Sequence, residues 1–266
     1  MKRITRRQIL TPIGLAAGSC VLSSCLSKNM TTSSGKDKKT DFPWPYAKLD
    51  PEITAERAYS DCAKGHCMYG VFASVVGQLA EQKGEPYRTF PVDMMRYGAG
   101  GTGGSGSLCG ALNGASALFG LFAPSEEQTK QFISELFLWY EQKELPAFVP
   151  RKPILDVEVP LSVSDSVLCH VSVTKWAETS GQKAFSKPRK ERCRRLTADT
   201  AKRAVEILNT SLSGKYEAQM EMTEEVKACG SCHTKDSEMA NTRGTMSCGS
   251  CHFSLAKDHP AFTPES

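Results

Sequence analysis

The stretch after Gly214 limits the fold more than any other feature of this chain. It contains few large apolar side chains, so it cannot bury a core of its own without a covalent or metal staple. The sequence CGSCH occurs in it twice, at residues 229–233 and 248–252, as an internal repeat. We therefore expect these two motifs to hold the group that organises residues 215–266.

Two kinds of group fit this spacing of cysteines. The pattern C-x2-C-x15-C-x2-C is typical of a structural zinc site, but a histidine also follows each cysteine pair directly. The chain has five histidines, so composition alone would place two of them there with a probability of about one in a few thousand. Covalent haem attachment requires this arrangement, because two thiols add to the haem vinyl groups and the adjacent imidazole ligates the iron. The sequence predicts two covalent c-type haems, with zinc as the competing interpretation.

The two motifs supply the covalent and proximal contacts, and the distal axial positions need further ligands. The attachment residues are Cys229, Cys232, Cys248 and Cys251, and the proximal iron ligands are His233 and His252. The candidate distal ligands are His259, His66 and His170. Methionine is the competitor, with Met220, Met222, Met239 and Met246 close in sequence, and it would raise the reduction potential.

We favour histidine as the distal ligand for a geometric reason. His66 adjoins Cys67 in the chain, with consecutive Cα atoms about 3.8 Å apart. His170 likewise adjoins Cys169, so a haem bound by either histidine would lie beside a second candidate redox site. His259 lies shortly beyond the second motif and can reach round a haem edge or serve a neighbouring haem in a dimer, so we rank it first. The alternatives are that His259 is a solvated residue and that His66 only ends a helix.

Residues 1–25 are typical of an export signal rather than of folded structure. A basic start leads into an apolar or small stretch, residues 9–22, that is short for a membrane span. TRRQIL at residues 5–10 resembles the twin-arginine signal, which exports folded proteins; a general secretory signal is the alternative. LSSC at residues 22–25 resembles a bacterial lipobox, which would make Cys25 a lipidated N-terminus on the periplasmic side of the membrane. The alternative is cleavage to a free, soluble protein.

Removal of the signal also changes the charge of the protein. Its four basic residues, Lys2, Arg3, Arg6 and Arg7, equal the formal net charge of +4, so the processed chain has a net charge of zero. A basic patch for nucleic acid is therefore not supported. Residues 26–50 begin with a polar, serine-rich stretch, and we expect a flexible linker there.

Residues 51–214 have the pattern of a helical domain. Apolar residues repeat at helical spacing after Cys67, after about Ser107 and over residues 197–209. SEEQ at residues 125–128 is a capping-box signature for a further helix. The proline-rich residues 146–166 form a long connection, in which DVEV at residues 156–159 is a candidate short strand. We expect a mostly α fold, a helical bundle followed by a small, irregular tail whose helical potential is limited to about residues 216–228.

The body of the chain also contains dispersed cysteines and a glycine-rich stretch. The cysteines are Cys62, Cys67, Cys109, Cys169 and Cys193. Three of them, Cys67, Cys109 and Cys169, lie near expected helix starts, where the helix dipole favours the thiolate that binds metal or reacts. The alternatives are buried apolar cysteines or structural disulfides. The glycines at residues 98–106 match a dinucleotide-binding pattern only because they are so dense, and we expect them to let the backbone turn tightly near Cys109.

The sequence around these cysteines resembles a family of redox-active proteins named for a C-GCAxxG-C-C pattern. The similarity covers residues 55–209, through GHCMYGVFASVVGQLAEQKG, GSLCGALNGA and RCRRLTADTAKRAVEIL, although Met68 and Tyr69 stand where the family usually has alanine and glutamine. With two CxxCH motifs behind it, the chain resembles the split-Soret cytochromes c. The resemblance implies a homodimeric, dihaem electron carrier with an iron–sulfur cluster. Its redox cysteines would be Cys67, Cys109, Cys169 and Cys193. A lipobox is not a feature that the family implies.

Three functions follow from these patterns. The first is an exported electron-transfer protein that works between a redox donor protein and an acceptor protein. The second is a redox enzyme that reduces a small molecule at the cysteines or at an open haem position. The third is a zinc-stapled surface lipoprotein that binds partners, which would lack haem absorption bands.

Overall fold

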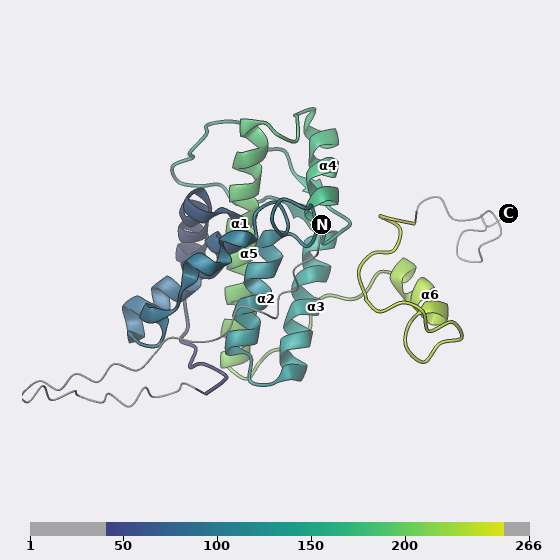
Figure 1. The fold of residues 1–266 in the computed structure, drawn as a ribbon, viewed down its shortest axis with the longest axis horizontal. Helices are drawn as coiled ribbons and strands as arrows, with labels where there is room; N and C mark the ends of the chain where they lie inside the picture. Colours follow the sequence, from purple (N-terminus) through teal and green to yellow (C-terminus); the bar gives the residue numbers. More distant parts are fainter. Residues whose placement is uncertain (1–40, 253–266) are drawn as a thin grey trace, which may run out of the picture. The chain divides into compact units, whose positions relative to one another are not determined.

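In the computed structural model, residues 41–252 are described, and they are mostly helical, as the sequence predicts (Figure 1). The helices are α1 (Pro51–Lys83), α2 (Gly110–Phe122), α3 (Glu126–Gln142), α4 (Cys169–Ser180), α5 (Lys187–Leu212) and α6 (Glu224–His233). Two short 3-10 helices, η1 (Tyr87–Thr89) and η2 (Val92–Tyr97), follow α1. The strands β1 (Glu144–Leu145) and β2 (Ser162–Val163) form a small antiparallel pair.

Helix α1 consists of two helical halves joined at His66. Asp50 begins the first half, because its carboxylate accepts the backbone N–H groups of Glu52 and Ile53 at 2.8 and 3.0 Å. His66 has a φ of 70°, in the left-handed region, and interrupts the helix. The second half therefore starts at Cys67, as expected from the sequence.

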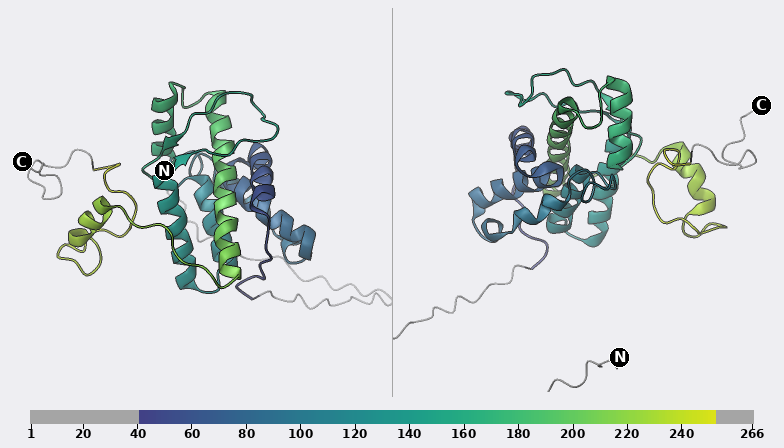
Figure 2. Two further views of the ribbon diagram at one scale, coloured as in Figure 1. Left: turned by 180° about the vertical axis from the view of Figure 1, so that it is seen from behind. Right: turned by 45° about the horizontal axis from the view of Figure 1, so that its top comes forward.

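The core lies between α1, α2 and α5, and α3 packs against α2. Figures 1 and 2 show α2, α3 and α5 alongside one another, with the two halves of α1 against them. Large apolar side chains such as Phe72, Leu112 and Val205 are fully buried there. Burial of each such side chain stabilises the fold by about 1.5–3 kcal/mol, which makes this the main stabilising contact of the helical body.

The start of α3 agrees with its local capping signal, whereas the start of α5 does not agree with its predicted position. The Ser125 hydroxyl accepts the backbone N–H of Gln128 at 3.2 Å, so the predicted capping site is confirmed. Helix α5 begins ten residues before the predicted residue 197, because Ser186 caps it by accepting the N–H of Arg189 at 3.2 Å. Helix α4 begins at Cys169, where a helix start is expected from the sequence, although its extent was not predicted.

Two expectations for irregular segments are wrong. Residues 156–159 form no strand; the strand of this connection is β2, where Val163 pairs with Glu144. Residues 41–50, the end of the expected linker, pack on the body instead. Trp44 donates its backbone N–H to Leu121 at 2.8 Å, and Leu49 is only 2% exposed. The remaining linker, residues 26–40, and the export signal lie outside the described residues.

The tail contains little apolar core, as its composition predicts. Between residues 215 and 252 the structure buries one residue, Val226. The helix of the tail is α6, which starts at the Thr223 cap rather than near residue 216 and extends through the first CGSCH motif. Within the described part of the chain, no helix combines the length and apolar character needed to span a membrane.

A pair of glycines in α2 tests the packing of this core. A Cβ at Gly110 would lie 2.0 Å from the carbonyl oxygen of Gly98, whereas a Cβ at Gly120 would contact nothing within 4 Å. We expect Gly110→Ala to lower the free energy of unfolding by about 2–3 kcal/mol through overpacking. Gly120→Ala, the matched control, should raise it by about 0.5–1 kcal/mol through helix propensity. Denaturant unfolding followed by circular dichroism measures both, and equal effects of the two substitutions would contradict the close approach.

Candidate functional site

Two of the dispersed cysteines are brought together by backbone pairing. Leu108 and Leu168, which precede Cys109 and Cys169, form an antiparallel bridge. The N–H of Cys109 donates to the carbonyl of Val167 at 2.9 Å, and the N–H of Cys169 donates to Ser107 at 2.8 Å. The bridge therefore places the start of α2 beside the start of α4, with a cysteine at each.

The glycines of CGALNG bring Cys109 to the helix that begins at Cys67. A Cβ at Gly114 would lie 2.6 Å from the carbonyl oxygen of Met68, and one at Gly110 would overlap Gly98. The N–H of Met68 also donates to Gly98 at 3.4 Å. These glycines thus allow α2 to approach the second half of α1, which explains their position without a phosphate-binding role.

Cys193, on α5, contacts Cys67 directly. The Cys67 thiol lies beside the thiols of both Cys193 and Cys62. Cys62 in turn accepts the Thr197 hydroxyl at 3.4 Å. All four cysteines that the sequence proposes as redox ligands therefore belong to one region, with Cys62 as a fifth thiol at its buried edge.

A buried network joins two of these cysteines across four helices. Tyr140, on α3, interacts with Cys109, and its hydroxyl lies 2.9 Å from the Ser172 hydroxyl of α4. Arg192, on α5, donates to the same Ser172 oxygen at 2.8 Å and also contacts Cys193. The network thus runs from Cys109 through Tyr140, Ser172 and Arg192 to Cys193.

Arg192 is the residue of this network that points to a bound group. It is 2% exposed, its Nε atom has no hydrogen-bond partner, and it forms no ion pair with a described carboxylate. Burial of an unpaired cation costs several kcal/mol. An anionic group beside Cys109 and Cys193 would offset that cost, and thiolates bound to a metal centre carry such a charge.

The thiols themselves are held in the neutral form. Burial and then the neighbouring thiols of Cys109 and Cys193 raise the pKa of Cys169 to about 12. The pKa of Cys109 is raised by burial, and that of Cys193 by its hydrogen bond with Cys67 and by burial. The interaction with Cys193 lowers the pKa of Cys67, but the contact with Cys62 and burial raise it by more. The pKa of Cys67 therefore lies well above its usual value. The expectation that helix starts favour thiolate here is wrong, because burial outweighs the helix dipole.

These residues fit a metal centre in their chemistry. Cysteine sulfur is the ligand type of iron–sulfur clusters, and a bound metal cation drives thiol deprotonation. As they stand, no three histidine, cysteine or carboxylate side chains among residues 41–252 are close enough together to hold a metal ion. The region is therefore a set of neighbouring donors around a buried cation rather than a closed coordination sphere.

The two CxxCH motifs open into one cavity. The first motif forms the end of α6, and the second forms a turn in which the N–H groups of Cys251 and His252 donate to Cys248 at 3.1 and 3.0 Å. The cavity has a volume of about 690 Å³, in the range of cofactor pockets. Residues that line it include Met222, Val226, Cys229, His233, Cys248 and His252.

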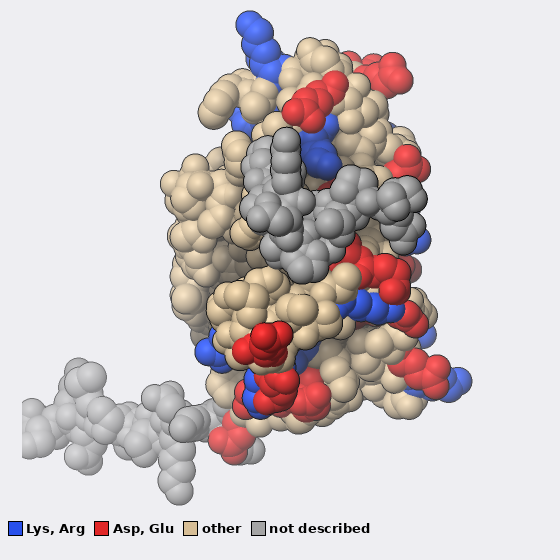
Figure 3. Space-filling model, turned by 90° about the vertical axis from the view of Figure 1, so that its right-hand side faces the viewer, with Lys and Arg blue, Asp and Glu red and all other residues tan. Residues whose placement is uncertain are grey.

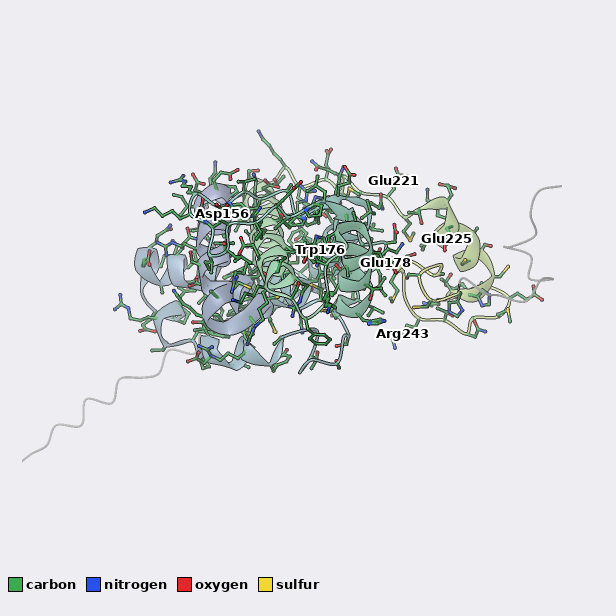
Figure 4. All side chains as sticks on the ribbon, turned by 90° about the horizontal axis from the view of Figure 1, so that it is seen from above. Asp156, Trp176, Glu178, Glu221, Glu225 and Arg243 are labelled. Atoms are coloured by element: carbon green, nitrogen blue, oxygen red, sulfur yellow. The ribbon has the colours of Figure 1, made fainter. Side chains whose placement is uncertain are left out.

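Contacts inside the tail fit haem attachment. The Nδ1 atom of His233 lies 2.8 Å from the Asn241 side-chain oxygen, a contact that orients the ring. A Cβ at Gly249 would lie 2.3 Å from Glu225 of α6, so the second motif packs closely on the helix of the first. Figure 4 labels Glu225 on that helix.

The candidate distal ligands are not gathered at this cavity. His66 and His170 are both exposed, and neither lines the cavity. Met222 does line it, whereas Met246 lines a separate cavity of about 350 Å³ against α3. His259 and Cys25 lie outside the described residues.

Several residues of these sites are not evident from the sequence. From the sequence, Tyr140 and Ser172 are expected only to lie on helix faces. No local pattern indicates a role for Asn241. Arg192 stands beside Cys193 in the run RCRR, which was the one available signal, but the run does not tell which arginine is buried.

Comparison with known proteins agrees with this arrangement. The family model "Putative redox-active protein (C_GCAxxG_C_C)" matches residues 69–207, which include Cys109, Cys169 and Cys193 and begin just after Cys67. The chain is 44% identical over 206 residues to "Split-Soret cytochrome c" of Desulfovibrio desulfuricans, covering 75% of this chain and 74% of the relative.

A solved structure is also similar. It is described as a novel iron centre in the split-Soret cytochrome c from Desulfovibrio desulfuricans ATCC 27774, and it matches with a TM-score of 0.75 and 39% identity. The match covers 84% of this chain and 95% of that chain. Both comparisons confirm the resemblance seen in the cysteine and CxxCH motifs: the chain belongs to the split-Soret cytochrome c family.

Proposed function

We propose that this protein is an exported electron-transfer protein with two covalent c-type haems and an iron–sulfur centre. The observation that carries the proposal is the cavity of about 690 Å³ to which both CxxCH motifs contribute a cysteine and a histidine. The iron centre named for the solved relative supports the second part, together with the four neighbouring cysteines and the unpaired Arg192. One-electron exchange between protein partners follows from this chemistry.

At the haem site, each residue has a distinct task. A six-coordinate haem iron supplies one-electron exchange without making or breaking bonds to a substrate. Cys229 and Cys232, and Cys248 and Cys251, would fix the two haem edges by thioether bonds. Asn241 orients the ring of His233, which would ligate one haem iron. The apolar walls, including Val226, exclude water and so help to set the potential.

At the cysteine site, the protein would supply ligands and charge compensation. Cys67, Cys109, Cys169 and Cys193 are the proposed iron ligands, and their protons leave when the metal binds. An iron–sulfur cluster supplies a second one-electron store there. Arg192 neutralises part of the thiolate charge. Its guanidinium is held in place by the Ser172 hydroxyl, which in turn contacts the Tyr140 hydroxyl.

The location and the partners are also part of the proposal. The twin-arginine-like TRRQIL and the lipobox at Cys25 support export and a lipid anchor on the periplasmic side of the membrane. The family resemblance supports a homodimer, in which the exposed His66 and His170 are the histidines that we expect to reach the haem of a second copy. The face seen in Figure 3 has acidic and basic side chains interspersed, a mixed surface suited to transient protein partners.

Metal and haem analysis of cysteine variants tests the two centres separately. In anaerobically purified protein we expect two haems per chain, with iron in excess of haem and acid-labile sulfide. Cys193→Ser should lose the excess iron and keep both haems, and Cys248→Ser with Cys251→Ser should lose one haem and keep the excess iron. Cys62→Ser, which removes a thiol outside the proposed ligand set, is the control. Iron no greater than haem in the wild-type protein, without sulfide, would rule out the iron–sulfur centre.

The distal ligands are tested by single substitutions. His259→Ala, His66→Ala and His170→Ala should convert one haem from low spin to high spin in two of the three variants, because the iron loses an axial ligand. Absorption and magnetic circular dichroism spectra report the spin state. Met222→Leu is the matched variant, because Met222 lines the cavity. A high-spin haem in Met222→Leu, with none in the histidine variants, would assign the distal position to methionine.

The anchor is tested at the mature N-terminus. We expect mass spectrometry of the membrane fraction to find Cys25 as the first residue, carrying acyl chains, because the lipobox ends there. Cys25→Ala should abolish the modification. A wild-type protein whose unmodified N-terminus lies beyond Cys25 would contradict this.

A further inference from the structure

A buried carboxylate of α3 links the tail to the cysteine site. Glu141 is 5% exposed, and its Oε1 atom accepts the backbone N–H of Ser247 at 3.2 Å. The same carboxylate also lies near the backbone N–H of Val167. Ser247 directly precedes Cys248 in the second CxxCH motif. The carbonyl of Val167 accepts the N–H of Cys109 at 2.9 Å.

These contacts form a continuous series between the two sites. It runs from Cys248 through Ser247, the Glu141 carboxylate and Val167 to Cys109. The tail and the cysteine site are both reached through backbone N–H groups, so the link does not depend on flexible side chains at either end. The preceding residue, Tyr140, contacts the same Cys109 from α3.

The surroundings of Glu141 suit this linking role, because no other group within residues 41–252 donates a hydrogen bond to its carboxylate. Among the described residues it forms no ion pair, and burial and then the nearby Asp165 raise its pKa, against the two backbone hydrogen bonds. A buried carboxylate without a cationic partner is costly unless hydrogen bonds satisfy it. The N–H groups of Ser247 and Val167 are therefore what holds it in place.

A second buried glutamate of α3 provides a contrast. Glu135 pairs with Arg203 at 2.5 Å and accepts the backbone N–H groups of Gln219 and Met220, each at 2.9 Å. Glu221, which follows Met220 (Figure 4), accepts the side-chain amide of Gln142 through its backbone carbonyl at 2.9 Å, and Gln142 also belongs to α3. Glu135 thus holds the start of the tail, and none of these contacts leads to a cysteine of the site.

We propose that Glu141 is a positioning residue that docks the second CxxCH motif on the helical body and provides the bonded route for electrons between the tail and the cysteine site. The electron route rests on the proposed function, whereas the docking role does not. Substitution by glutamine keeps the size of the side chain but leaves one accepting oxygen for two N–H groups.

The experiment compares Glu141→Gln with Glu135→Gln in the purified holoprotein. We expect amide hydrogen exchange of the peptide that contains Ser247 to lose about tenfold in protection in Glu141→Gln, the contribution of one hydrogen bond to a charged group. In Glu135→Gln the loss should fall on residues 219 and 220 and leave Ser247 protected. Unchanged exchange at Ser247 in Glu141→Gln would overturn the docking role. The same loss at Ser247 in both variants would do so too, because it would mean general loosening of the tail.

Electron movement is the second readout. After flash reduction of the haems, the electron should reach the iron centre severalfold more slowly in Glu141→Gln than in the wild type, and at the wild-type rate in Glu135→Gln. An unchanged rate in Glu141→Gln, with both centres fully loaded, would overturn the route. Wild-type protein without haem or excess iron would instead overturn the proposed function, and hydrogen exchange would still decide the docking role.

Discussion

The helical body is organised around a buried guanidinium. Arg192 of α5 reaches Ser172 of α4, which meets Tyr140 of α3, and Tyr140 meets Cys109 at the start of α2. Four helices therefore share one polar network in an otherwise apolar interior. Burial of the unpaired Arg192 guanidinium costs free energy. That cost is offset if the neighbouring sulfurs become anionic on binding metal. The glycines of α2 and the interruption of α1 at His66 serve the same end, since they bring Cys109 close to the helix that begins at Cys67.

The tail follows a different principle. With Val226 as its single buried residue among those described, it has no core to define its shape. The walls of its cavity come from both CxxCH motifs, and a covalently bound haem would supply the apolar surface that the sequence lacks. Glu135 and Glu141 attach this tail to α3 by accepting backbone N–H groups, and the Tyr216 ring packs on Phe132 of the same helix.

Local signals in the sequence predicted the fold well where they exist. Ser125 and Gln128 lie three residues apart, so the start of α3 was evident, and the chemistry of CGSCH is contained in five consecutive residues. Helix α4 buries only Ser172 and Trp176, so it has no apolar stripe to detect. Helix α6 begins at Thr223, whose cap contacts the apolar Val226 and gives no capping-box signature. The pairing of Leu108 with Leu168, the burial of Arg192 and the neutral thiols all arise from contacts between distant segments, which a single sequence does not specify.

The central claim is that the cysteines around Arg192 hold a redox-active iron centre that is distinct from the haems. Low-temperature electron paramagnetic resonance of the fully reduced holoprotein tests it most directly, because low-spin ferrous haem has no unpaired electron. We expect a signal from a reduced iron–sulfur centre, and its loss in Cys193→Ser while the haem absorption bands remain. A fully haem-loaded, fully reduced protein without any such signal and without acid-labile sulfide would contradict it.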